Sequence, residues 1–118
     1  MAKEKEKIKP NTEEVEKEKQ RLLAIFKDID ENKLEFVQHN IDNLAWLNVS
    51  LSILRNKIDK EGTQVKYNNG GGQSGVKDNP DIKVLVAYQK NVIAISKQLL
   101  ELVPPSAKKS KLKEFLNG

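Results

Sequence analysis

Residues 68–80 read NNGGGQSGVKDNP, and this glycine-rich stretch separates two long segments whose apolar residues follow a helical pattern. A loop of this kind that runs into a helix either binds phosphate at the helix N-terminus or turns the chain between two helices. A nucleotide-binding loop needs a buried strand before it and a Lys-Ser or Lys-Thr pair at the start of the helix. Here Lys77 is followed by Asp78, and Asp81 adds a second carboxylate that would repel phosphate. The stretch therefore predicts a connection between two helices.

The form of this connection is left open by the residues before the glycines. In residues 63–69, TQVKYNN, Val65 and Tyr67 alternate with polar residues, which is typical of an exposed hairpin arm. A structureless loop of about 18 residues is uncommon in a compact domain. Two alternatives follow: an irregular glycine-rich loop, or a small β-hairpin that pairs residues 63–67 with residues 74–77.

The segment after the connection predicts a helix from about Pro80 to Val103. Asn79 can cap it, Pro80 suits the first helical position, and the two prolines at 104 and 105 stop it. One apolar strip has a heptad-like spacing, and a second lies beside it. The first strip consists of Leu85, Tyr88, Val92, Ile95, Leu99 and Leu102, and the second of Ile82, Val86, Ile93 and Leu100.

The segment before the connection predicts a still longer helix, from about Glu31 to Glu61. Asp30 can cap its start, and Gly62 is a typical residue after a helix end. Its main strip is Leu34, Val37, Ile41, Leu44, Leu47, Leu51, Leu54 and Ile58, and Phe36, Trp46, Val49 and Ile53 lie off that strip. Both long helices therefore carry apolar residues on two faces.

A first helix is expected from about Thr12 to Ile29, because Asn11 and Glu14 can form a capping box. Its apolar strip is narrow and weak in the first half. The expected fold is therefore all-α, with three helices, a long antiparallel helical hairpin, and disordered basic ends. The domain division is a basic flexible arm (1–10), a helical domain for oligomerisation and DNA packaging (11–103), and a basic tail (104–118).

Two apolar strips on each long helix exceed what one intramolecular partner can cover. We therefore expect a homo-oligomer; the alternative is a monomeric three-helix bundle in which the first helix covers the second strips. The residues expected to mediate oligomerisation are Trp46, Val49, Ile53, Val86, Ile93 and Leu100.

The net charge of +4 is concentrated at the ends of the chain. Residues 1–10 carry +2 and residues 104–118 carry +3, whereas the remainder carries −1. Basic ends attract nucleic-acid phosphates, but they also keep small proteins soluble. The candidate DNA-binding residues are Lys3, Lys5, Lys7, Lys9, Lys108, Lys109, Lys111 and Lys113.

Other kinds of chemistry have little support in the sequence. There is no cysteine, the only histidine is His39, and Ser50 and Ser52 have no recognisable His-Asp partners. No metal-ligand spacing occurs. We therefore expect no enzyme activity, no cofactor and no metal. The absence of a long apolar run and of a signal-like N-terminus predicts a soluble protein inside the cell, without membrane contact.

The order of these parts resembles the phage terminase small-subunit family. The resemblance rests on a Gly-Val-Lys-x-Asn-Pro signature before the last long helix and a Leu-x-Pro-type ending after it, and it spans residues 12–107. The matching residues are Gly75, Val76, Lys77, Asn79 and Pro80, followed by Leu102, Pro104 and Pro105.

The resemblance implies a ring-forming, non-enzymatic subunit. Such a subunit binds double-stranded viral DNA and recruits the terminase large subunit, an ATPase and nuclease, in the cytoplasm of the bacterial host. The sequence departs from this expectation in one respect, because no helix-turn-helix with a basic recognition helix can be identified. The alternative is a helical protein-interaction module of phage origin, structural or regulatory, that does not bind DNA.

Overall fold

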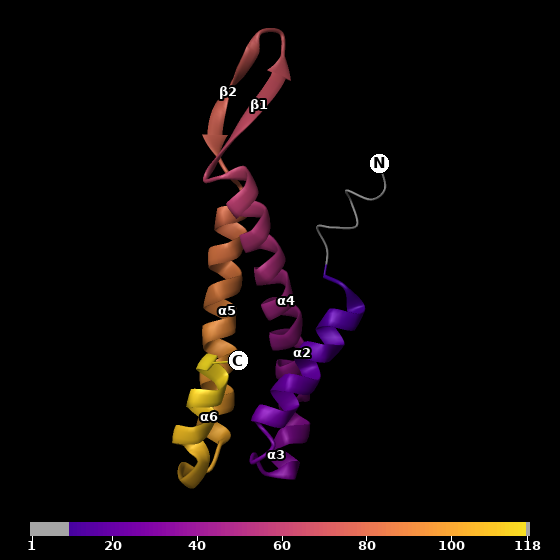
Figure 1. Cartoon of the computed structure of the whole chain (residues 1–118), viewed down its shortest axis with the longest axis vertical. Coiled ribbons are helices and arrows are strands. Elements are labelled where there is room, and N and C mark those ends of the chain that lie inside the picture. The colour runs from indigo at the N-terminus through magenta and orange to yellow at the C-terminus, as the bar shows by residue number, and fades with distance from the viewer. Residues whose placement is uncertain (1–9, 118) are drawn as a thin grey trace.

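The computed structural model describes residues 10–117, and for residues 109–112 and 117 it describes the backbone only. Within this range the chain forms five helices and one antiparallel β-hairpin (Figure 1). The elements are α2 (Thr12–Ile25), α3 (Glu31–Phe36), α4 (Gln38–Glu61), β1 (Gln64–Gly70), β2 (Gln73–Asp78), α5 (Asp81–Leu102) and α6 (Pro105–Asn117). The prediction of an all-α fold with three helices is therefore wrong.

The helix α2 begins where a capping residue was expected and ends earlier. The Asn11 side chain accepts a hydrogen bond of 2.8 Å from the Glu13 amide, so Asn11 caps the helix, although the bond does not involve Glu14. The helix ends at Ile25, and the chain then forms a turn that still buries Phe26 and Ile29. The expected extension to Ile29 is therefore wrong, because these two side chains reach the core from a turn.

The expected helix 31–61 is divided at Val37. Asp30 caps α3 by accepting a hydrogen bond of 2.9 Å from the Asn32 amide, as predicted. The Val37 amide donates to both Lys33 and Leu34, and the Val37 carbonyl accepts from Ile41. Backbone hydrogen bonding thus continues from α3 into α4. The break between the two helices is a local bend at Val37, which the spacing of apolar side chains does not reveal.

Helix α4 ends at Glu61 with Gly62 as its C-cap, and the β-hairpin follows. Gly62 has a φ of 87°, a backbone conformation that is unfavourable for residues other than glycine. The two strands pair antiparallel from Gln64 opposite Asp78 to Asn68 opposite Ser74, and the register shifts between Asn68 and Gly70. Three consecutive glycines with positive φ close the turn, at residues 70, 71 and 72. The glycines therefore form a β-turn at the far end of a ribbon and have no helix directly after them.

Helix α5 runs back along α4, and α6 then folds over the lower part of α5 (Figure 1). α5 starts at Asp81, one residue after Pro80. The prolines do end α5, but Pro105 is the first residue of α6, where a missing amide hydrogen bond costs nothing. The prediction of a disordered C-terminal end is therefore wrong, since a helix occupies residues 105–117.

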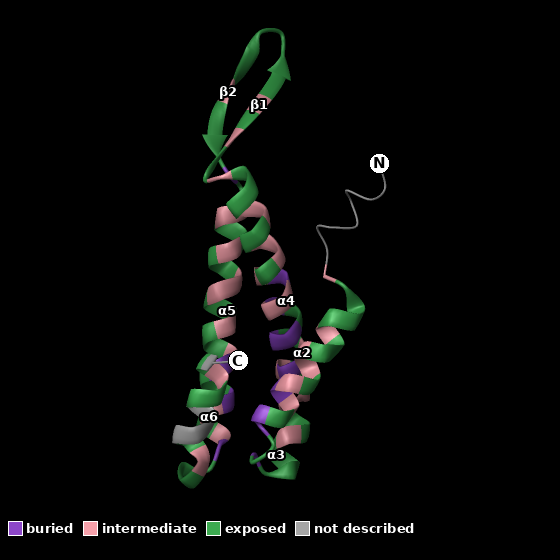
Figure 2. Ribbon diagram, viewed as in Figure 1, coloured by how far each residue is buried: buried purple, intermediate pink, exposed green. Residues whose placement is uncertain are grey.

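The hydrophobic core lies at one end of the molecule. Its buried residues come from α2, the turn after it, the first half of α4 and the end of α5 (Figure 2). They are Leu22, Ile25, Phe26, Ile29, Ile41, Leu44, Ala45, Leu99 and Val103. The β-hairpin lies at the opposite end of the rod.

Candidate functional site

The molecule is far more elongated than a compact domain of its length. Its extents are 63 × 26 × 24 Å and its radius of gyration is 18.2 Å, whereas about 13 Å is typical of a compact chain of this size. The reasons are that α4 and α5 extend well beyond α2, which covers only the lower part of α4, and that the β-hairpin projects beyond both helices (Figure 1). Among the described residues, a long section of the helical hairpin therefore meets a third helix only at its lower end, where Ile93 shares a groove with Phe115 of α6 and Ile53 shares a depression with Glu14 of α2.

We call this section the distal hairpin and define it as residues 51–61 of α4 and 81–93 of α5. None of its apolar side chains is buried, although it holds a high proportion of them. These side chains are Leu51, Ile53, Leu54 and Ile58 from α4, and Ile82, Val84, Leu85, Val86, Tyr88, Val92 and Ile93 from α5. In the single chain, the distal hairpin therefore leaves at least partly exposed many apolar side chains of the kind that normally fill a protein core.

Helix α5 presents apolar side chains on both of its flanks. Val84 and Val86 are both more than one third exposed, and two residues apart on a helix corresponds to a rotation of about 200°. Ile93 and Leu100 follow Val86 at intervals of seven residues, so they continue the Val86 flank. The two flanks of α5 therefore point away from each other.

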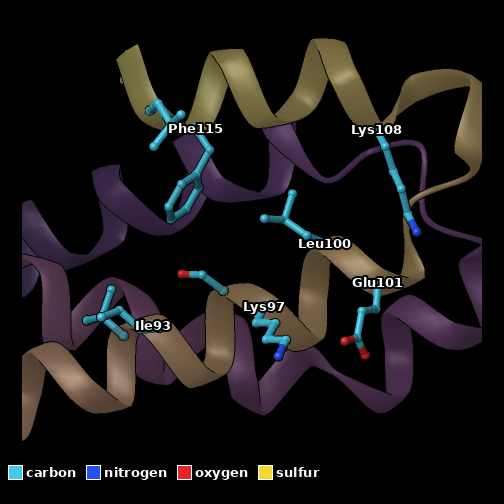
Figure 3. A pocket seen from close by; sticks show the side chains of 9 residues that line it. Ile93, Lys97, Leu100, Glu101, Lys108 and Phe115 are labelled. Carbon is cyan, nitrogen blue, oxygen red and sulfur yellow. The ribbon is translucent and has the colours of Figure 1, made fainter.

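The Val86 flank leads into a groove between α5 and α6, which we call the α5–α6 groove (Figure 3). It has a volume of 520 Å³. Ile93 and Leu100 line it from α5, and Phe115 and Leu116 line it from α6. Ile93 is 67% exposed and Leu116 is 74% exposed. Lys97, Glu101 and Lys108 stand along its border. An apolar floor with charged residues at the border is typical of a protein-binding surface.

The Val84 flank borders a second groove, the α4–α5 groove, with a volume of 280 Å³. Trp46 and Ile53 line it from α4, and Val84 and Tyr88 line it from α5. The rings of Trp46 and Tyr88 meet edge to face with centroids 5.6 Å apart, yet Trp46 remains 41% exposed. The two grooves share none of the residues that the structure describes. The chain therefore carries two different apolar surfaces.

Polar contacts fix the end of the distal hairpin to the base of the β-hairpin. Asn79 is almost completely buried. Its side-chain amide donates a hydrogen bond of 2.9 Å to the Gly62 carbonyl, and its Oδ1 accepts one of 3.0 Å from the Asp81 amide. Its backbone amide donates to the Thr63 carbonyl at 2.9 Å. One residue thus joins the end of α4, the start of α5 and the base of the ribbon.

An ion pair reinforces the same junction. Lys57 Nζ lies 2.6 Å from Asp81 Oδ2 and 3.8 Å from Glu61 Oε1. The hydrogen bond with Asp81 raises the pKa of Lys57 above its ordinary value, although partial burial opposes this effect. Lys57 therefore remains a cation beside two carboxylates at neutral pH.

Helix α2 is attached to α4 by a second polar cluster. Glu18 accepts two hydrogen bonds from Arg21, at 2.8 and 2.7 Å, and one of 2.8 Å from the Asn48 side chain. Burial raises the pKa of Glu18, but the hydrogen bonds from Arg21 and Asn48 outweigh it, and the pKa is lowered below 4.5. Nearby, Lys19 forms a salt bridge of 3.0 Å with Asp42.

The residues expected to mediate oligomerisation lie on both surfaces. Ile93 and Leu100 line the α5–α6 groove, and Trp46 and Ile53 line the α4–α5 groove. Val86 is exposed on the α5 flank above the first groove, and Val49 is half-buried in a polar depression between α2 and α4. Leu100 is the most covered of the set on α5, since it packs against the core.

The candidate DNA-binding lysines can be placed only in part. Lys3, Lys5, Lys7 and Lys9 lie outside the described residues, and Lys109 and Lys111 belong to α6 without a described side chain. Lys108 and Lys113 are exposed on α6. The basic segment at the C-terminal end is therefore presented on a helix that contacts α2 and α5.

Leu116, Phe115 and Val84 are surface-lining residues that the sequence reasoning missed. The prediction of a tail for residues 104–118 assigns no surface to the first two. The sequence does contain a signal for this helix. Pro105 is followed by good helix formers and by apolar residues at 107, 112, 115 and 116. Val84 belongs to neither apolar strip predicted for residues 80–103. Its exposure becomes visible only when α4 is placed beside α5.

Among the described residues no cluster of three or more His, Cys, Asp or Glu side chains could hold a metal ion. In the same part of the chain no helix is long and apolar enough to span a membrane. His39 is exposed on α4. Comparison of the chain with protein-family models, with curated proteins and with solved structures gives no match.

Proposed function

We propose that this chain is a terminase small subunit, an adaptor that self-assembles, binds double-stranded viral DNA and brings it to the terminase large subunit. In this proposal the chain has no active site of its own, needs no cofactor, and acts in the cytoplasm of a bacterial host. The signature residues 75–80 and the ending at 102–105 supply the family resemblance.

The observation that carries the self-assembly is the pair of uncovered apolar flanks on opposite sides of α5. A two-fold dimer uses the same patch on both copies, whereas two different patches bind head to tail. Head-to-tail contacts generate a closed ring when the rotation between copies closes. The α5–α6 groove and the α4–α5 groove have no residue in common, so they favour a ring over a simple dimer.

DNA binding is proposed to use the basic end segments. Lys108 and Lys113 are exposed on α6, and a ring repeats each lysine once per copy, so weak single contacts combine. Because phosphate contacts release counterions, the binding constant should fall steeply with salt concentration.

The test combines mass and DNA binding. Light scattering should give a mass of several subunits, and binding to a mixed-sequence duplex should weaken as salt rises. Replacement of Lys108, Lys109, Lys111 and Lys113 by Gln should lower the affinity and flatten the salt dependence. A control variant replaces four exposed lysines elsewhere, Lys27, Lys33, Lys60 and Lys83. A 13.4 kDa particle, or equal losses in both variants, would contradict the proposal.

The second candidate is a helical protein-interaction module of phage origin that does not bind DNA. The α5–α6 groove favours it, because an apolar groove between two helices can receive a partner helix. A monomer or dimer without measurable affinity for DNA at moderate salt would select this function.

A further inference from the structure

The β-hairpin has features that its own chain does not explain. Strands β1 and β2 project from the end of the rod, beyond all the helices (Figure 1). No residue of the ribbon from Gln64 to Asp78 is buried. A two-stranded ribbon without a sheet or helix against it is at best marginally stable in water. Within residues 10–117, no further strand pairs with either outer edge of the ribbon, so these edges carry backbone groups without a strand partner.

The ribbon is nevertheless built to hold one shape. Three glycines with positive φ form its turn, and Gly70 donates a hydrogen bond of 2.8 Å to the Asn68 side chain. The Tyr67 ring lies across the strand over Gly75, where an added Cβ would stand 3.1 Å from its hydroxyl. Asn79 fixes the base. An exposed ribbon with a defined turn and open edges is suited to strand pairing with another chain.

We propose that the ribbons of neighbouring copies pair edge to edge, β2 of one copy beside β1 of the next, and form one continuous antiparallel sheet. The inference rests on the self-assembly proposed above. In a ring whose axis follows the rods, every β1 points away from the helices and every β2 points back. Neighbouring β2 and β1 strands are then antiparallel without any rearrangement.

The residues of the ribbon are compatible with this pairing. Within the chain, Lys66 lies opposite Val76 and Lys77 opposite Val65. If the next copy used the same register, each lysine would again face a valine, so no like charges would stand opposite each other. Residues 64–78 contain no proline, the residue that most often blocks an edge strand. The ribbon therefore lacks a main obstacle to edge pairing.

The experiment uses one nitroxide label per copy. Because the chain has no cysteine, Val76→Cys gives a single labelling site, and Val76 is already 59% exposed. Equivalent residues on paired neighbouring ribbons are two strand spacings apart, about 10 Å. Electron paramagnetic resonance of the full-length assembly should therefore show strong dipolar broadening, which disappears when labelled copies are diluted with unlabelled chain.

The outcomes separate this inference from the proposed function. Light scattering on the same sample establishes whether an assembly is present. Label distances beyond about 20 Å, four strand spacings, in an assembly of several subunits would overturn the ribbon pairing and leave self-assembly intact. A monomer at every concentration would overturn both. As a second measurement, replacing residues 64–78 by a short turn should shift the mass towards smaller species at equal concentration, and an unchanged mass would contradict the pairing.

Discussion

The Asn79 side-chain amide donates a hydrogen bond of 2.9 Å to the Gly62 carbonyl, which ties the chain two residues before α5 to the residue after α4. The two residues are separated by the entire β-hairpin. One buried side chain therefore contributes to the position of the ribbon, beside the Lys57–Asp81 ion pair, and its role can be measured directly.

Asn79→Ala should lower the free energy of unfolding by about 1–3 kcal/mol, because the half-buried Gly62 carbonyl and Asp81 amide lose their hydrogen bonds. Urea unfolding followed by circular dichroism measures this. Asn69→Ala changes an exposed asparagine in the same hairpin and should cost less than about 0.5 kcal/mol. Equal stability of the Asn79 variant and the wild type would show that this junction does not hold the hairpin.

Ile93→Asp should abolish self-association without loss of helicity, because Ile93 is exposed in the single chain. A carboxylate buried in an apolar contact carries a large desolvation cost. Light scattering should show a 13.4 kDa particle. Ala94→Asp is the matched control, since the next residue points about 100° away and Ala94 is also exposed. If both variants keep the wild-type mass, the Val86 flank is not an interface.

Phe115→Ala should loosen α6. The Phe115 ring stands 6.2 Å from that of Phe26 and packs against the core. Because Phe115 is only half-buried, the expected loss is about 1–3 kcal/mol, below the usual cost of a fully buried phenylalanine. Hydrogen exchange of residues 105–117 should increase. Leu116→Ala, at a neighbouring exposed position, should leave stability nearly unchanged and weaken self-association instead.

Glu18→Gln should reveal an acid-dependent part of the stability. The pKa of Glu18 is lowered in the folded chain, so its contribution is fully present above pH 4.5 and is lost as the pH falls through the folded-state value. The variant should be less stable than the wild type by about 1 kcal/mol at neutral pH, and the difference should shrink below pH 4.5. Urea unfolding at a series of pH values tests this, and a difference independent of pH would argue against a role for the Glu18 charge.

Local chemistry made several helix boundaries predictable from the sequence. Asp30 and Gly62 lie at helix ends because a side-chain acceptor and a residue tolerant of positive φ are needed there. The bend at Val37 was not predictable, because the apolar strip passes through it unbroken. Helix α6 is absent from the prediction because the two prolines indicate the end of a helix, whereas Pro105 also begins the next one.

The site was predictable only as a surplus of apolar residues. Periodicity placed Trp46 off the main strip of one helix and Ile93 on a second strip of the other, and both are exposed in the single chain. Which groove each one lines depends on the crossing of α4, α5 and α6, which is a property of tertiary packing. The β-hairpin was one of two alternatives for residues 63–77, since the alternation of Val65 and Tyr67 is too short to decide alone.

The location of the core at one end of the rod has a consequence for how the chain loses structure. Helix α2 holds only the lower turns of α4, so an isolated copy should fray from the ribbon downwards, and amide opening should become steadily easier towards Gly71. Contact with neighbouring copies would slow amide exchange at the tip of the ribbon. Slow exchange there would therefore indicate association, independently of a mass measurement.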